Sequence, residues 1–178
     1  MKRHAARLLF VGVLLLAGFV AQSAPAAPNP VVASATGSGH MVRPDGTFRS
    51  FSFSARKSAD GSVKGQLQLN SRGFDVFVHI AIDCLRIEGN TAHMSGLITH
   101  TSDPDQAFIG ELNRVVVRDN GEGHGVIDQV SRIPENENNE DQRTCLDPPG
   151  TAPPTGQDPM GLLPLRDVHR GNVQVRGE

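Results

Sequence analysis

The sequence contains few of the aromatic residues on which many binding sites depend. Its 178 residues include no tryptophan and no tyrosine, and six of the eight phenylalanines follow residue 26. Tryptophan and tyrosine supply most of the flat surfaces on which sugars, bases and quaternary amines stack. The composition therefore argues against ligands that are held by stacking.

Common catalytic motifs are also missing. The sequence has no G-x-S-x-G nucleophile elbow, no H-E-x-x-H zinc motif, no glycine-rich phosphate loop and no dinucleotide fingerprint. No catalytic residue and no organic cofactor is assigned on this basis. An enzyme is the least supported class, and a hydrolase with an unrecognised site is the form of it that stays open.

The first 26 residues have the three parts of a secretory signal peptide. Three basic residues precede an apolar run, Leu8–Ala21, and the small-residue stretch Ala24–Ala26 follows it. The run is shorter than the ~20 apolar residues that cross a bilayer. We expect cleavage after Ala26 and a secreted or periplasmic protein with no membrane span; an uncleaved anchor is the alternative.

Removal of the signal peptide changes the charge of the protein. The whole chain has a net charge of −2, and residues 1–26 hold three of its 17 basic and none of its 19 acidic residues, which leaves a net charge of −5. Nucleic acids and anionic membranes attract clustered lysine and arginine. The acidic balance therefore argues against both as partners.

The sequence has only two cysteines, Cys84 and Cys145. They are too far apart for a redox-active C-x-x-C pair, and two cysteines in an exported protein usually pair with each other. We therefore predict a structural disulfide. The bridge would close a loop of about 60 residues and stabilise the fold by ~4 kcal/mol in the chain-entropy model.

Alternating apolar residues, which are typical of β-strands, run through most of the chain beyond the signal peptide. Phe51–Ala55 and Val63–Leu69 each place their apolar residues on one face. Between them, Ala59–Gly61 suits a three-residue hairpin loop that pairs Phe53 with Leu67. Because this register places the apolar residues of both strands on one side, the pattern and the turn agree.

The next two hairpins follow from their turn residues. Asn70–Gly73 is predicted to form a four-residue turn, which places Leu69 opposite Phe74. Gly89–Asn90 is predicted as the two-residue turn of the following hairpin. The apolar face changes parity close to residue 84, and this change predicts a β-bulge near Asp83–Leu85.

The remaining segments complete the fold prediction. Residues 134–161 are acidic and rich in proline, which predicts a long surface loop. With an opening strand at Ala33–Met41 and a last strand at Gly171–Val175, there are about eight strands. We predict a flexible segment over residues 27–34 and one all-β antiparallel domain over residues 35–178. An up-and-down barrel with its last strand beside the first is favoured over a two-sheet sandwich.

One turn has the residues of a metal site. Asp119, Asn120 and Glu122 alternate with glycines, and Asp128 follows on the next predicted strand. Calcium takes six to eight oxygen ligands from such side chains, so we consider calcium the candidate ion. The same residues also suit a hairpin turn for purely conformational reasons, and their spacing does not match an EF-hand.

The order of several short motifs resembles a family of small secreted bacterial proteins of uncharacterised function. The motifs are GSGH, FSFSA, CL-x3-GNTA, DNGEG and GNVQV, which begin at residues 37, 51, 84, 119 and 171. The resemblance covers roughly residues 35–176. It implies a bacterial source, a compact β domain and a bridge between Cys84 and Cys145, and it implies no reaction.

The sequence therefore leaves three functional hypotheses. The first is an exported, non-enzymatic β-domain that binds a small apolar ligand inside or a protein partner outside. The second is a calcium-stabilised structural or adhesive domain that uses the segment Asp119–Asp128. The third is the hydrolase with an unrecognised site.

Overall fold

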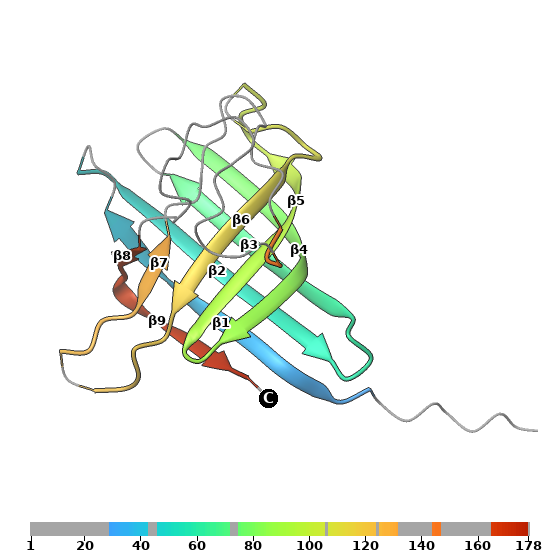
Figure 1. Cartoon of the computed structure of the whole chain (residues 1–178). Coiled ribbons are helices and arrows are strands. Elements are labelled where there is room, and N and C mark those ends of the chain that lie inside the picture. Colours follow the sequence, from blue (N-terminus) through green and yellow to red (C-terminus); the bar gives the residue numbers. More distant parts are fainter. Residues whose placement is uncertain are drawn as a thin grey trace, which may run out of the picture.

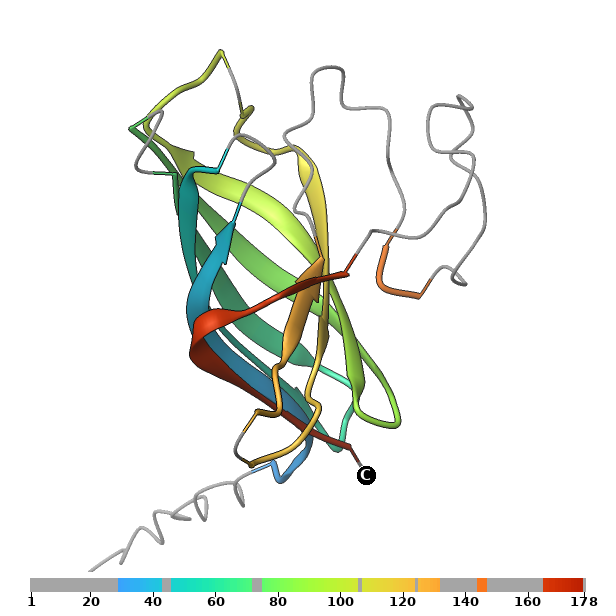
Figure 2. The same cartoon turned by 90° about the vertical axis from the view of Figure 1, so that its left-hand side faces the viewer.

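The computed structural model describes residues 29–42, 46–71, 75–105, 107–123, 125–131, 144–146 and 165–177. Regular structure in these residues is entirely β, and antiparallel strands form one sheet in the order β8-β7-β6-β5-β4-β3-β2-β1-β9. The strands are β1 Val31–Val42, β2 Phe48–Ser58, β3 Val63–Ser71, β4 Val76–Glu88, β5 Thr91–Thr101, β6 Leu112–Arg118, β7 Gln129–Ser131, β8 Leu165–Asp167 and β9 His169–Arg176. The sheet curls into a nearly closed barrel, as the two side views show (Figures 1 and 2).

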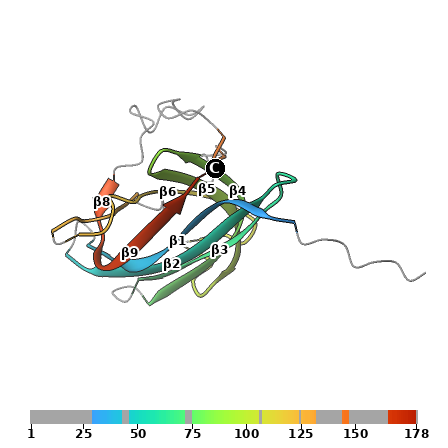
Figure 3. The ribbon, with the colours of Figure 1, turned by 90° about the horizontal axis from the view of Figure 1, so that it is seen from below.

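The barrel is closed by one continuous segment near the C-terminus. β8 pairs with β7 at one edge of the sheet, and β9 pairs with β1 at the other edge. Only Val168 separates the two strands in the sequence, so this segment bridges both edges (Figure 3). The predicted all-β antiparallel barrel, with its last strand beside its first, is confirmed.

The hairpins predicted from local pattern are largely confirmed. Phe53 pairs with Leu67 across β2 and β3. Gly89 and Asn90 form the turn between β4 and β5. The register of β4 on β5 shifts between Ile82 and Cys84, where the change of apolar face predicts a bulge.

Two predicted boundaries are wrong. β3 continues to Ser71, which pairs with Val76, so the turn follows residue 71 and Leu69 lies opposite Val78 rather than Phe74. At the N-terminus β1 begins at Val31, where its first residues pair with the end of β2, so residues 31–34 of the segment predicted to be flexible belong to a strand. The predicted signal peptide, residues 1–26, lies outside the described residues, as does all of the predicted loop 134–161 except residues 144–146.

The interior of the barrel holds one apolar cluster. The inward-facing side chains of Leu67, Ile80, Met94, Val117 and Val173 are almost completely buried, and they come from five different strands. Such contiguous burial is the main stabilising contribution to a domain of this size. Within the described residues, no helix is long and apolar enough to cross a membrane.

The outer face of the sheet is also covered at β5 and β6. All five residues of Asn113–Val117 are buried, although successive side chains of a strand point to opposite faces. The predicted disulfide is confirmed: Cys84 on β4 is bonded to Cys145, whose side chain is fully buried. The short segment Thr144–Leu146 is thus fixed to the barrel at β4.

Candidate functional site

The loop Asp119–Asp128 joins β6 to β7 and is organised by its own side chains. Asp119 Oδ1 accepts a hydrogen bond from Gly121 N at 2.8 Å, and Asp128 Oδ1 accepts one from Asn120 N at 2.9 Å. Asn120 Nδ2 donates to the Ile127 carbonyl oxygen at 2.7 Å. Gly121 has a φ of 93°, a left-handed conformation that glycine adopts without strain. These bonds hold both ends of the loop together.

The two aspartates of this loop also bind β9. Asp128 Oδ2 accepts a hydrogen bond from Val173 N at 2.7 Å, and Asp119 Oδ2 accepts one from Val175 N at 3.0 Å. Val173 and Val175 are alternate residues, so their N–H groups leave the same edge of β9, the edge away from β1. A buried or half-buried strand edge must satisfy its donors. Here two carboxylates take the place of a neighbouring strand, and they close the barrel between the β6–β7 loop and β9.

A cleft of about 380 Å³ lies between this loop and the corner where β8 meets β9. We call it the seam cleft; its walls are Gly121–Gly123 and Val126–Asp128 on the loop side, and Val168 with Arg170–Asn172 on the corner side. The loop and the corner lie next to each other at the left-hand side of Figures 1 and 3. Asn172 Nδ2 donates to Glu122 Oε1 at 3.2 Å, which links the two walls. This volume is within the range of small-molecule sites.

The corner side of the seam cleft is fixed by close backbone packing. A Cβ atom on Gly171 would overlap the carbonyl oxygen of Ser38 and the Cα atom of Gly39, so only glycine lets β9 approach β1 here. Val168 is buried, and its side chain lies against Gly39. The corner therefore supports Arg170, which directly precedes Gly171.

Arg170 is the unusual residue of the corner. Its φ is 52°, a left-handed conformation that residues with a Cβ rarely adopt, and its side chain is exposed at the wall of the cleft. The guanidinium makes no hydrogen bond or ion pair with the described residues, whereas Glu122 and Asn172 nearby bond to each other. Among the described residues that line the seam cleft, Arg170 is the one cationic residue, and its exposed side chain can reach a ligand.

All four residues of the predicted metal site are at this seam. Asp119 and Asp128 bind β9, Asn120 bonds to Asp128 and Ile127 within the loop, and Glu122 lies on the wall of the cleft. Each carboxylate oxygen of the two aspartates already accepts a backbone N–H. Within the described part of the chain, no group of three or more histidine, cysteine or acidic side chains has the arrangement of a metal site.

Calcium binding stays a prediction, and a thermal melt tests it. A ligand that binds only the folded protein raises the melting temperature. An increase in Tm on addition of calcium, reversed by a chelator, would support the ion. An identical Tm in both conditions would leave the backbone N–H groups as the partners of Asp119 and Asp128.

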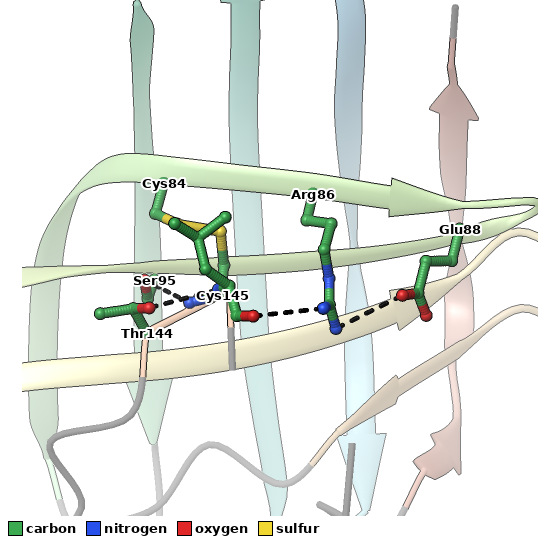
Figure 4. The surroundings of a disulfide bond; sticks show 7 residues. Cys84, Arg86, Glu88, Ser95, Thr144 and Cys145 are labelled. Carbon is green, nitrogen blue, oxygen red and sulfur yellow. Dashed lines mark hydrogen bonds and ion pairs between the residues drawn. A yellow bond between two sulfur atoms is a disulfide. The ribbon is translucent and has the colours of Figure 1, made fainter. Parts of the chain in front are cut away.

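A second polar cluster surrounds the disulfide on the outer face of the barrel (Figure 4). Cys145 N donates to Ser95 Oγ at 3.0 Å. Arg86 Nη1 donates to the Leu146 carbonyl oxygen at 3.3 Å, and its Nη2 atom lies 3.5 Å from Glu88 Oε1. These contacts hold the segment around Cys145 against β4 and β5, and they give it a structural role.

His93 is buried on the same outer face and is expected to make stability depend on pH. Burial, and then the positive charge of Arg86, lower the pKa of His93, although Glu88 acts in the opposite direction. The unfolded chain then binds more protons than the folded protein between the lowered pKa and ~6.5. The free energy of unfolding should therefore fall as the pH drops below about 6.5.

Urea unfolding of the wild type and of His93→Gln at several pH values measures this effect. The difference in unfolding free energy between the two proteins should be constant above pH 7.5. As the pH falls towards 5, the wild type should lose stability relative to the variant. The variant controls for all other titrating groups. Parallel pH profiles would show that His93 does not contribute.

Comparisons with protein-family models, with curated proteins and with solved structures give no match for this chain, so the functional argument depends on the geometry of the seam cleft.

Proposed function

We propose that this chain is an exported, non-enzymatic β-barrel protein that binds a small polar ligand in the seam cleft. The observation that carries the proposal is Arg170, an exposed cation in a left-handed conformation that makes no hydrogen bond or ion pair with the described residues. The inward-facing side chains already form one contiguous core, so we favour a site outside the barrel over an apolar ligand inside it. Export is consistent with the disulfide and with the predicted signal peptide.

The conformation of Arg170 has an energetic cost. A residue with a Cβ in the left-handed region is destabilised by about 1–2 kcal/mol, whereas glycine is not. Arginine at this position therefore costs stability and makes no hydrogen bond or ion pair with the described residues in return. Strained residues of this kind are concentrated at ligand sites, where the side chain is needed for something other than the fold.

The variant Arg170→Gly separates strain from binding. We expect its Tm to be about 2 °C higher than that of the wild type. The stability gained by relief of the backbone strain should exceed the stability lost because glycine gives the unfolded chain more conformational freedom. The carboxylate 4-methylpentanoate should shift the backbone NMR signals of Gly121, Gly123 and Asn172 in the wild type and should leave them unchanged in the variant.

Asp75→Gly is the matched control. Asp75 also has a left-handed conformation, with a φ of 55°, but it does not line the seam cleft. This variant should change Tm by a similar amount and keep the ligand-induced shifts. If 4-methylpentanoate shifts none of the cleft signals in the wild type, or shifts them equally in Arg170→Gly, the proposed site is wrong.

A further inference from the structure

We infer that the ligand of the seam cleft is a free α-amino acid with an aliphatic side chain. This inference rests on the proposed function and specifies the ligand of the same site. The lining of the cleft is mainly polar, with a cation on one wall and an anion on the other wall, and the loop adds a smaller apolar surface. An aliphatic amino acid is a small molecule that carries the complement of all three.

The cation of the site is the guanidinium of Arg170. Guanidinium groups bind carboxylates through two parallel hydrogen bonds, and these are among the stronger polar contacts of proteins. Arg170 is attached to a corner that Gly171 and Val168 pack closely against β1, so its backbone is already in place before a ligand binds. The α-carboxylate of an amino acid is the partner that we assign to it.

The anion of the site is Glu122. Its Oε1 atom accepts a hydrogen bond from Asn172 across the cleft, which directs the carboxylate towards the opposite wall. Its Oε2 atom makes no hydrogen bond with the described residues and can accept one from an ammonium group. We assign Glu122 Oε2 to the α-ammonium of the ligand.

The apolar part of the site is on the loop. Val126 and Ile127 line the cleft and are 44% and 48% exposed, which is unusual for large aliphatic residues. An aliphatic ligand side chain placed on them removes some apolar surface from water, but because the apolar part of the cleft is small, the gain per methylene is well below the ~0.8 kcal/mol of complete burial. The cleft of about 380 Å³ has room for a ligand of the size of leucine.

Four small probes test the three assignments separately. Leucine carries all three groups, 4-methylpentanoate lacks only the ammonium, 3-methylbutylamine lacks only the carboxylate, and free glycine lacks the side chain. NMR titration of the mature protein, without the predicted signal peptide, gives a dissociation constant for each probe. We expect leucine to bind about fivefold tighter than 4-methylpentanoate and 3-methylbutylamine, since each lacks one exposed charge pair that contributes up to about 1 kcal/mol. Leucine should also bind tighter than glycine, because glycine lacks the apolar contact.

The variant Glu122→Gln tests the ammonium contact. It keeps an oxygen that can accept from Asn172 and removes the negative charge. It should therefore bind 4-methylpentanoate as the wild type does, or more tightly, and lose the preference for leucine. Asp167→Asn, an exposed carboxylate outside the cleft, is the control for loss of charge and should keep that preference.

The outcomes distinguish this inference from the proposed function. If 4-methylpentanoate and leucine bind equally well and Arg170→Gly abolishes both, the cleft binds carboxylates and the amino-acid assignment is wrong. If none of the four probes shifts the signals of the cleft, both the inference and the proposed function are wrong. A leucine preference that persists in Glu122→Gln would overturn the assignment of Glu122.

Discussion

Asp128→Ala should lower the free energy of unfolding by about 3 kcal/mol and Tm by about 9 °C. The carboxylate is 6% exposed, and it accepts Asn120 N at 2.9 Å and Val173 N at 2.7 Å. Removing it leaves two backbone donors without these acceptors, and each donor that stays desolvated costs about 1–3 kcal/mol. One of these donors belongs to the loop and the other to β9, so the variant should loosen the closure of the barrel. Thermal melting and urea unfolding measure the loss.

Hydrogen exchange shows which part of the protein is destabilised in the same variant. The Val173 amide should exchange much faster in Asp128→Ala, because its acceptor is gone, while amides in the β3–β4 ladder should follow global stability alone. Asp167→Ala is the control, since within the described part of the chain its exposed carboxylate accepts only a 3.3 Å hydrogen bond from Gln129. The control should change stability by less than about 0.5 kcal/mol. Equal effects of the two substitutions would show that Asp128 does not close the barrel.

The part of the fold that the sequence predicts well is the part that local pattern determines. The pairing of Phe53 with Leu67 follows from alternation and one short turn, and the bulge near Asp83 follows from a change of parity. Both features arise from residues that are close in the sequence. An antiparallel barrel built from such hairpins is therefore readable without any long-range information.

The register of β3 on β4 was not predictable in the same way. β3 extends to Ser71, whose Oγ accepts a hydrogen bond from the Nε atom of Arg49 at 2.7 Å. Arg49 is buried and shares the inward face of β2 with Phe51. An arginine and a serine that face the interior contradict the usual alternation of apolar and polar residues, so the pattern placed the turn too early.

The orientation of β6 cannot be predicted from alternation either, for a different physical reason. Alternation reports a strand that is buried on one face only, but all of Asn113–Val117 is buried. The polar members of this run, Asn113 and Arg114, are each less than a tenth exposed. A strand that is covered on both faces has no polar face to reveal its orientation in the sequence.

Half of the candidate site was visible in the sequence and half was not. Asp119, Asn120, Glu122 and Asp128 lie in one short segment, and the structure places them at one seam. Arg170 and Asn172 reach the same cleft only because the barrel closes through β9, about 50 residues later in the chain. The left-handed backbone of Arg170 has no signature in the sequence, since arginine is seldom found there.

The double variant Cys84→Ala/Cys145→Ala should lose about 4 kcal/mol of stability, equivalent to about 12 °C in Tm. The bond joins residues 61 positions apart, so it removes many conformations from the unfolded chain. It also holds Cys145, which is fully buried, against the outer face of the barrel. Melting of the double variant, and of the wild type under a reducing agent, measures the effect, and the two losses should agree.

Ser95→Ala separates the bridge from the contacts around it. This variant removes the acceptor of Cys145 N, a 3.0 Å hydrogen bond, and leaves the disulfide intact (Figure 4). It should cost only about 1 kcal/mol, since one hydrogen bond to a neutral group is lost. If the double variant loses no more than Ser95→Ala does, the chain-entropy argument fails for this protein. In that case the hydrogen bonds around Cys145, together with the one that Arg86 donates to Leu146, would hold the segment on the barrel without the covalent bond.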